Sequence, residues 1–201
     1  MRLFRPCFIS VRLFPEALFR VSTSEKVLYL TFDDGPDVLS TPPLLGILSH
    51  HNIKAVFFCS GKEASENPDL IEMIKKGGHV IGNHGYNHPN GFVTGTQKYL
   101  DDIYLASTVT SSSLFRPPYG RLRLSQYREL KKKFRIIMWD LMPYDFDRSF
   151  GSERSLSCLK RFIRPGSVIV LHDIACSTLN DFLENFIGFA KEAGYRFGIL
   201  S

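Results

Sequence analysis

Short β-rich runs alternate with helical patterns along almost the whole chain after residue 26, and this alternation constrains the fold more than any other feature of the sequence. The expected strands cover residues 27–33, 53–58, 79–83, 114–116, 135–140, 167–172 and 195–200. Helical stretches between them begin where a capping residue precedes proline, as at Thr41-Pro42 and Asn67-Pro68. The pattern predicts an α/β protein whose parallel strands are connected by helices.

The composition is that of one globular domain. Of the 201 residues, 44% are hydrophobic and 22% are charged, which excludes an intrinsically disordered chain, a collagen and a coiled-coil array. Charges or prolines interrupt every apolar run before it reaches the roughly 18 residues that a membrane-spanning helix needs. We therefore expect a single domain over residues 27–201, preceded by a segment of different character, residues 1–26.

Residues 1–26 begin basic and then apolar, as a secretory signal peptide does. Arg12 and Pro15 cut the apolar stretch short and no small-residue cleavage site follows, so no cleavable signal peptide is expected. We expect the segment to pack on the domain; the alternative is a basic, aromatic patch that rests on a membrane surface through residues 1–20. The side chains on which this choice depends are Phe4, Phe8, Phe14, Leu18 and Phe19. The sequence leaves the compartment open between the cytoplasm and the periphery of a membrane.

The charge and the cysteines indicate what the chain does not bind. A net charge of +5 is mild beside that of a nucleic-acid-binding protein with a clustered basic face, so nucleic acid is not an expected partner. The cysteines contain no CxxC pair and are interpreted as small buried apolar residues without a disulfide framework: Cys7, Cys59, Cys158 and Cys176. We expect the protein to be a monomer.

Side chains that can do chemistry collect where the expected strands end. In parallel sheets and βα barrels, ligands bind at the carboxyl ends of the strands. The residues at or just after these ends are Asp33-Asp34-Gly35, His84, His88, Arg116, Asp140 and His172-Asp173. This collection predicts a functional site, because a purely structural protein has little use for it.

Asp34, His84 and His88 are the candidate metal ligands. The HxxxH spacing brings the two imidazoles to one side of a helical turn or tight loop. The turn supplied by Gly35-Pro36 lets one of two neighbouring aspartates bind a cation while the other stays free. Two nitrogens and one carboxylate suit Zn²⁺ and also a non-haem Fe(II) centre.

The ordered blocks TFDDGP, NHGYNH, RPPYG, WDLMPYDFD and VLHD, from Thr31 to Asp173, resemble those of the polysaccharide deacetylase family with NodB homology, a group of metal-dependent carbohydrate esterases. The resemblance covers most of the chain apart from the N-terminal segment. It implies a distorted (β/α)7 barrel, similar to a TIM barrel, which agrees with the seven strands expected above. It also implies removal of N-acetyl groups from amino-sugar polymers or oligomers such as peptidoglycan or chitin-like substrates. The implied cofactor is one divalent metal ion, with zinc first and cobalt, nickel or manganese as alternatives.

The resemblance implies a role for each matching residue. Asp33 would be the general base and His172 the general acid, with Arg116 positioning Asp33. Asp145 would favour the protonated form of His172, and the backbone N–H of Tyr119 would stabilise the oxyanion. The metal ligands would be Asp34, His84 and His88. The residues in contact with substrate would be Tyr119, Pro118, Leu171, Trp139 and Phe146, with Tyr119 and Leu171 forming the wall of the acetyl pocket.

Departures from the family pattern keep other functions open. Gly85 stands where the family usually has Ser or Thr, which removes a hydroxyl that can brace the ligand loop, and Phe146 replaces a common Trp. Together with the unusual spacer Met142-Pro143-Tyr144, Phe146 changes the groove wall, on which the choice of substrate depends. The alternatives are the same hydrolysis on an O-acetylated sugar or a small non-carbohydrate amide, and a non-catalytic sugar-binding module. An Fe(II) oxygenase fits less well, because Asp33 and His172 would have no acid–base role.

Overall fold

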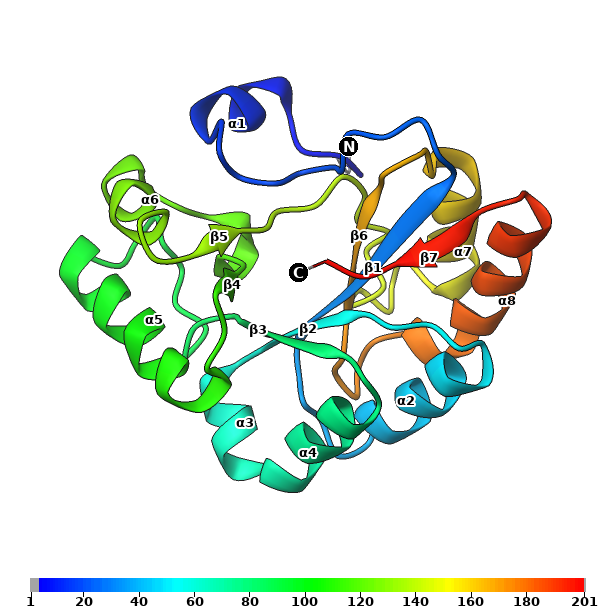
Figure 1. Ribbon diagram of the computed structural model, residues 1–201, viewed down its shortest axis with the longest axis horizontal. Coiled ribbons are helices and arrows are strands. Elements are labelled where there is room, and N and C mark those ends of the chain that lie inside the picture. The colour runs from blue at the N-terminus through cyan, green and yellow to red at the C-terminus, as the bar shows by residue number, and fades with distance from the viewer. Residues whose placement is uncertain (1–3, 201) are drawn as a thin grey trace.

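The computed structural model describes residues 4–200, in which a seven-stranded parallel sheet curls into a barrel with helices on its outer side (Figure 1). The strands are β1 (Val27–Asp34), β2 (Val56–Cys59), β3 (Val80–Asn83), β4 (Leu114–Phe115), β5 (Arg135–Ile136), β6 (Val168–His172) and β7 (Arg196–Gly198). The helices are α1 (Phe8–Leu13), α2 (Thr41–His50), α3 (Gly61–Glu66), α4 (Pro68–Lys76), α5 (Thr96–Thr110), α6 (Leu124–Leu130), α7 (Ser152–Phe162) and α8 (Leu179–Glu192), with the 3₁₀ turn η1 (Pro118–Gly120). Each expected strand is present at its expected place, so the predicted α/β architecture is confirmed.

The register of the central strands explains why the polar residues at their ends meet. The sheet order is β5-β4-β3-β2-β1-β6, and β7 pairs with the first part of β1. Strands β2 and β6 are buried along almost their whole length, as expected for a parallel sheet covered on both faces. Parallel pairing places Asp33 of β1 opposite Phe58 of β2 on one side and His172 of β6 on the other. The end of β1 is therefore held between two neighbouring strand ends.

The N-terminal segment fills the gap between the two ends of the sheet. Strand β5 is shorter than expected, because after Ile136 the chain bridges first to this segment, at Leu18, and then to β6, where Leu141 pairs with Ile169. The Leu18 N–H donates to the Ile136 carbonyl at 2.9 Å, and the Leu18 carbonyl accepts from Met138 N–H at 2.8 Å. Two residues further on, Arg20 forms a bridge with Ser167 next to β6. The segment thus lies between β5 and β6, next to the bridge from Leu141 to Ile169 that joins the chain after β5 to β6.

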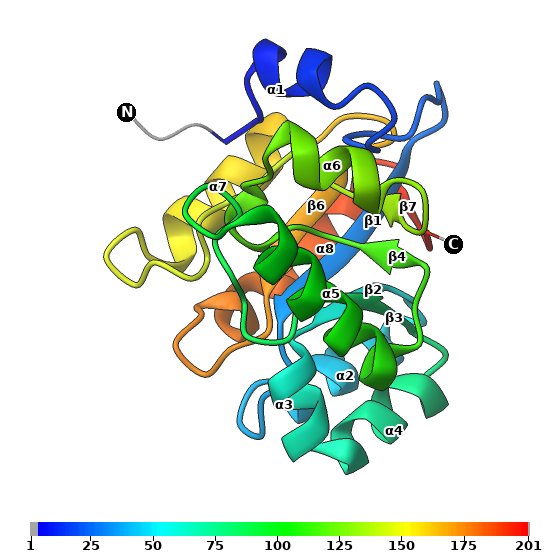
Figure 2. The ribbon, with the colours of Figure 1, turned by 90° about the vertical axis from the view of Figure 1, so that its left-hand side faces the viewer.

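Helix α1 lies outside the ring formed by the other helices, between α6 and α7 in Figure 1, and it stands at the edge of the molecule again in Figure 2. The chain on both sides of α1 is anchored. Phe4 stacks on Phe162 with ring centroids 5.6 Å apart, and Phe14 is buried against Tyr127 at 5.0 Å. Phe8, by contrast, is exposed.

Two further expectations concern membrane spans and cysteines. Within residues 4–200, no helix combines the length and the apolar character needed to cross a membrane. All four cysteines are free. Cys59 and Cys158 are buried as expected, whereas Cys7 and Cys176 are exposed, which corrects the interpretation of all four as core residues. Cys7 and Cys176 lie in short loops, where neighbouring apolar letters do not predict burial.

Candidate functional site

The end of β1 and the loop after β3 bring together the three candidate metal ligands. The Asp34 Oδ1 atom lies 3.1 Å from His88 Nε2 and 3.5 Å from His84 Nε2. Their possible ligand atoms all lie within 4.8 Å of one another. Both Asp34 and His88 adopt left-handed backbone conformations, with φ of 76° and 53°, which turn these side chains toward the same space.

The chemistry of this donor set fits a divalent cation. Burial by itself would raise the pKa of Asp34, but hydrogen bonds from His84 and His88 outweigh that effect and hold the pKa well below its usual range. The His84 Nδ1 atom lies 2.8 Å from the Arg116 carbonyl oxygen, which orients the ring and leaves Nε2 facing the aspartates. An ionised carboxylate and two oriented imidazoles are the ligands that zinc and related ions take in catalytic sites.

Asp102 on α5 braces the loop that carries the histidines, a role that the sequence did not predict. Its carboxylate accepts hydrogen bonds from Tyr86 N–H at 2.7 Å, from Asn87 N–H at 3.2 Å and from the Asn87 side-chain amide at 2.8 Å. Gly85, at φ 77°, turns the chain next to this carboxylate. The brace that a hydroxyl at position 85 could provide is therefore supplied from a helix that is remote in sequence.

Replacing Asp102 with alanine should weaken metal binding without touching a ligand. We expect an affinity lower by about ten-fold, because outer residues that fix metal ligands commonly contribute that much. The measurement is competition for zinc with a chromophoric chelator. Asp101→Ala is the matched control, since Asp101 is exposed and, within residues 4–200, its side chain accepts a hydrogen bond only from Gln97 of its own helix. Equal affinities of the Asp102 variant and the wild type would contradict this role.

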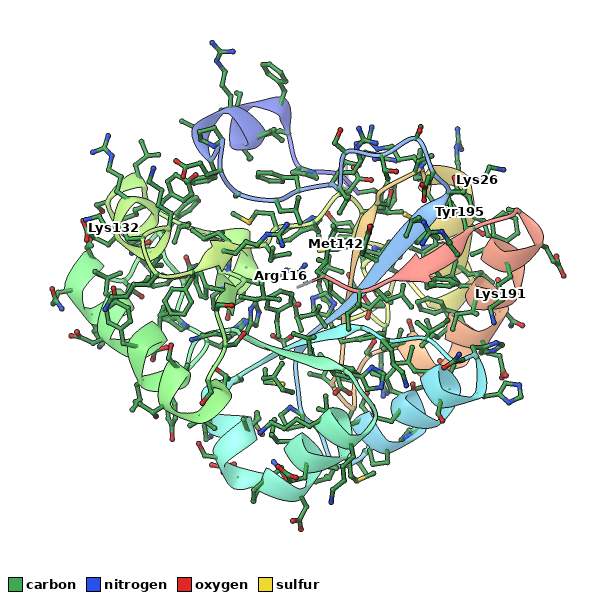
Figure 3. All side chains as sticks on the ribbon, in the orientation of Figure 1. Lys26, Arg116, Lys132, Met142, Lys191 and Tyr195 are labelled. Atoms are coloured by element: carbon green, nitrogen blue, oxygen red, sulfur yellow. The ribbon has the colours of Figure 1, made fainter. Side chains whose placement is uncertain are left out.

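Asp33 and Arg116 form a buried ion pair beside the ligands. The Arg116 Nη1 atom donates to Asp33 Oδ1 at 2.6 Å and to Thr31 Oγ1 at 2.7 Å. The guanidinium is fully buried, and its other nitrogens donate to the carbonyls of Ile137 and Met138. Figure 3 shows Arg116 in the middle of the barrel. Its hydrogen bonds fix one oxygen of Asp33, while the other, Oδ2, lies 3.7 Å from His84 Nε2.

His172, at the end of β6, is held by Asp145. The buried carboxylate accepts a hydrogen bond from the His172 backbone N–H at 2.7 Å and lies 3.0 Å from the ring Nδ1 atom. Burial by itself would lower the pKa of His172, but the charge and the hydrogen bond of Asp145 raise it to about 9. The ring is therefore cationic at neutral pH, and Nε2 is the nitrogen that Asp145 does not contact.

Tyr119 lies in the turn η1 and covers the histidine side of the site. It is non-glycine with φ 59°, its side chain is exposed, and its ring centroid lies 4.5 Å from that of His88. The hydrogen bonds of this turn run from Gly120 N–H to the Pro117 carbonyl and from Arg121 N–H to the Pro118 carbonyl. The Tyr119 N–H takes no part in these bonds.

A cavity of about 440 Å³ joins these groups. Its lining consists of Asp33, Asp34, His84, His88, Tyr119, Gly120, Arg121, Trp139, Met142, Phe146, Val170, His172, Ile174 and Cys176. The lining includes the three expected metal ligands, the expected general base Asp33 and the expected general acid His172. It also includes Trp139 and Phe146, which were expected to contact the substrate. Cys176 had no sequence signal for a place here.

Leu171 and Pro118 do not line the cavity, which corrects the expectation for both. Leu171 is fully buried in the core against the helices, while Val170 and His172 face the cavity. Successive strand residues point to opposite sides of a sheet, so only Val170 can share the side of His172. Pro118 is buried in the turn η1. Val170 therefore takes the place that the sequence assigned to Leu171.

Asp140 also lies away from the site, although it follows an expected strand. It accepts hydrogen bonds from Arg5 at 2.7 Å, from Ser167 at 2.6 Å and from Arg164. Its hydrogen bond to Val168, at the start of β6, places it at the opposite end of that strand from His172.

The remaining histidines have surroundings that agree with a structural or surface role. His79 is buried and its Nδ1 accepts from Ala55 N–H at 3.2 Å. His50 and His51 lie near Glu184 and could offer three ligand atoms, but the Lys191 ammonium lies 3.3 Å from His51 Nδ1. A cation at that place opposes the binding of another.

Comparison with known proteins identifies the relatives of this chain. The sequence profile of the family described as "Polysaccharide deacetylase" matches residues 20–138. A peptidoglycan-N-acetylglucosamine deacetylase of Bacillus cereus is 34% identical over 178 residues, which make up 84% of this chain and 64% of that protein. The chain thus spans less than two thirds of that relative's length.

The solved structures agree with the expected barrel. A crystal structure of a peptidoglycan N-acetylglucosamine deacetylase superposes with a TM-score of 0.89 at 30% identity, over 97% of this chain and 95% of the other. A mutant of a CE4-family pseudoenzyme with restored enzymatic activity superposes with a TM-score of 0.80 at 28% identity, over 90% of this chain and 68% of the other. The barrel fold is confirmed. Because a pseudoenzyme shares it, activity has to be argued from the residues of the cavity.

Proposed function

Because the chain belongs to the polysaccharide deacetylase family, we propose that it hydrolyses the N-acetyl amide of amino sugars in a polymer or oligomer, of the peptidoglycan or chitin type. One observation carries this proposal. A buried carboxylate, an imidazole held by Asp145 and a three-residue ligand set line one cavity of about 440 Å³. A binding module without catalysis would not need a base and an acid on either side of a metal site.

Asp34, His84 and His88 would hold one divalent cation, with zinc as the first choice. When bound, such an ion polarises a carbonyl group and lowers the pKa of a coordinated water. The surrounding side chains contribute the proton transfers.

Asp33 acts as the general base in this proposal. Arg116 holds its Oδ1 atom and supplies a counter-charge in a buried place. The Oδ2 atom, which faces the ligand histidines, accepts the proton of the attacking water. Arg116 is a positioning residue, because its donors are occupied by protein oxygens and it does not line the cavity.

His172 acts as the general acid. An amide resists hydrolysis because its amine leaves poorly without a proton, and the Nε2 atom of His172 can donate one to the departing nitrogen. Asp145 positions the ring through Nδ1 and keeps it cationic. The Tyr119 N–H is free of the hydrogen bonds in its own turn and can donate to the oxyanion. Trp139 and Phe146 form the apolar wall for the sugar and its acetyl group.

The pH profile tests the link between Asp145 and His172. The pKa of His172 is raised to about 9, so its acid form persists through neutral pH and is lost as the pH rises toward that value. Asp145→Asn removes the charge that raises this pKa, so the alkaline limb of the kcat/KM profile should move to lower pH. An alkaline limb that stays in place in Asp145→Asn would contradict the assignment of that limb to His172.

The direct test of the proposed function is acetate release. The zinc-loaded protein is incubated with N-acetylglucosamine oligomers, peptidoglycan fragments, acetylated xylan and small acetamides, with and without a chelator. We expect acetate from the amino-sugar substrates, loss of activity with the chelator and recovery on adding zinc. Release only from xylan or from small amides would favour the alternative substrates. Binding of the oligomers without acetate release would favour a sugar-binding module.

A further inference from the structure

Helix α1 presents an apolar surface that no other part of residues 4–200 covers. None of its six residues is buried. Exposed fractions are 76% for Phe8, 66% for Ile9, 41% for Val11 and 46% for Leu13. A six-residue helix has little stability of its own in water, so its position depends on the anchors at Phe4 and Phe14. Exposed apolar side chains gathered on one projecting element mark an interaction site.

Arginines surround a cavity directly beside this surface. The cavity measures about 310 Å³ and is lined by Arg5, Arg20 and Arg164 together with Val11 of α1. One carboxylate, Asp140, also lines it and pairs with both Arg5 and Arg164. Three guanidinium groups against one carboxylate leave an excess of positive charge.

The arginines are accessible although they are partly paired. The Arg5 and Arg164 side chains are 30% and 48% exposed, whereas Asp140 is 3% exposed. Arg20 is exposed and donates to the Pro165 carbonyl at 2.9 Å. A fourth cation, Arg12, is exposed on α1 itself. The Asp140 carboxylate is therefore buried in the protein, while the guanidinium groups reach the solvent.

We propose that this surface, made of α1 and the arginines beside it, docks the protein on an anionic membrane. The apolar side chains of α1 would enter the boundary between headgroups and acyl chains, and the guanidinium groups would contact lipid phosphates. Guanidinium suits this place because it is weakly hydrated and its planar fork matches phosphate oxygens. In Figures 1 and 2 α1 stands at the edge of the molecule, outside the barrel, as such docking requires.

Charge and size favour a lipid surface over a second copy of the chain. A symmetric dimer through this surface would place the arginines of one copy near those of the other. A short helix also offers much less than the roughly 800 Å² per partner that stable protein interfaces bury. A membrane needs only a few inserted side chains, and its phosphates complement the excess charge.

The chain is held by aromatic contacts on both sides of α1, so α1 can dock on a membrane without unfolding. Phe4 is stacked on Phe162, and Phe14 is buried against Tyr127. Apart from Val11, the exposed apolar side chains of α1 and Arg12 are not among the residues that line the described cavities, so they can be changed without altering the deacetylase site.

The experiment is co-sedimentation of the full chain with vesicles of phosphatidylglycerol or of phosphatidylcholine, at low and at physiological salt. We expect binding to phosphatidylglycerol that weakens with salt, and little binding to phosphatidylcholine. The double variant F8S/I9S should bind phosphatidylglycerol at least about ten-fold more weakly. Arg12→Glu should also weaken binding to phosphatidylglycerol and leave the weak binding to phosphatidylcholine unchanged. The matched control is M73S/L105S, which removes exposed apolar side chains from α4 and α5 and should bind as the wild type does.

Three outcomes would overturn the proposal. The first is wild-type binding by F8S/I9S, and the second is failure of the wild type to bind phosphatidylglycerol at low salt. The third is a dimer in analytical ultracentrifugation that F8S/I9S dissociates, which would assign the surface to a second copy. Acetate release from soluble oligomers is measured alongside and should be equal in all variants. Failure of membrane binding is thereby separated from failure of the proposed enzyme function.

Discussion

Asp33→Asn is expected to lose about 10²- to 10⁴-fold in kcat while it still binds metal at the wild-type stoichiometry. Asparagine keeps the shape of the side chain but cannot accept a proton from water near neutral pH. The metal should remain because the ligand atoms come from Asp34, His84 and His88. The measurements are acetate release from an N-acetylglucosamine oligomer and metal content after dialysis, determined by mass spectrometry.

Asp34→Asn is the matched comparison, because it makes the same chemical change one residue further along. We expect it to lose metal, since Asp34 is the carboxylate within 3.1 Å and 3.5 Å of the two histidines. Adding excess zinc should restore part of the activity of Asp34→Asn and none of that of Asp33→Asn. Equal metal loss in the two variants would show that the ligand and the base have been assigned to the wrong aspartates.

Asp33→Asn also changes stability, and the activity measurement has to allow for it. Arg116 is fully buried, and its ion pair with Asp33 supplies its counter-charge. Leaving a buried charge without its partner typically lowers the free energy of unfolding by about 3–5 kcal/mol. Asparagine retains an oxygen that can accept the Arg116 hydrogen bond, which reduces this cost. Circular dichroism on heating identifies a temperature at which the variant is folded, and turnover is compared there.

His172→Ala is expected to lower amide hydrolysis by about 10²- to 10⁴-fold and to leave metal content unchanged. The amine of an amide needs a proton in order to leave. An activated aryl acetate does not, because its phenolate is a good leaving group. Hydrolysis of the aryl ester should therefore be affected much less than that of the N-acetyl substrate.

The ratio of the two activities distinguishes an acid from a residue that only shapes the site. His79→Ala is a useful control, because His79 is a buried histidine whose ring accepts a backbone hydrogen bond outside the cavity. It should leave the ratio of amide to ester hydrolysis unchanged. If His172→Ala lost both activities equally with metal still bound, His172 would position the substrate or stabilise the oxyanion and would not be the acid.

The sequence indicates some residues of the candidate site and gives no signal for others. The HxxxH spacing and the Asp33-Asp34 pair indicate the metal ligands. In each motif the two side chains lie within a few residues of each other, so the local backbone places them together. Alternation along β6 also separates Leu171 from Val170 and His172, so the strand period alone indicates that Leu171 faces away from the cavity. Asp102 and Cys176 carry no comparable signal. Each reaches the site from an element whose position depends on how the barrel closes.

The sequence by itself determined the order of strands and helices and the side chains at the strand ends. Local periodicity, capping residues and turns act over a few residues, so they can be read directly from the letters. Parallel pairing then brings Asp33 and His172 together, because the carboxyl ends of the strands share one edge.

Only the tertiary structure decided how the barrel closes and what lies outside it. Leu18 pairs with residues around Ile137, more than a hundred positions away, at the place where β5 and β6 form the two ends of the strand order. That pairing fixes Phe14 in the core and leaves Phe8 in solvent, although both belong to one basic, apolar segment. The physical reason is that burial depends on contacts between remote parts of the chain, which no local pattern in residues 1–26 encodes.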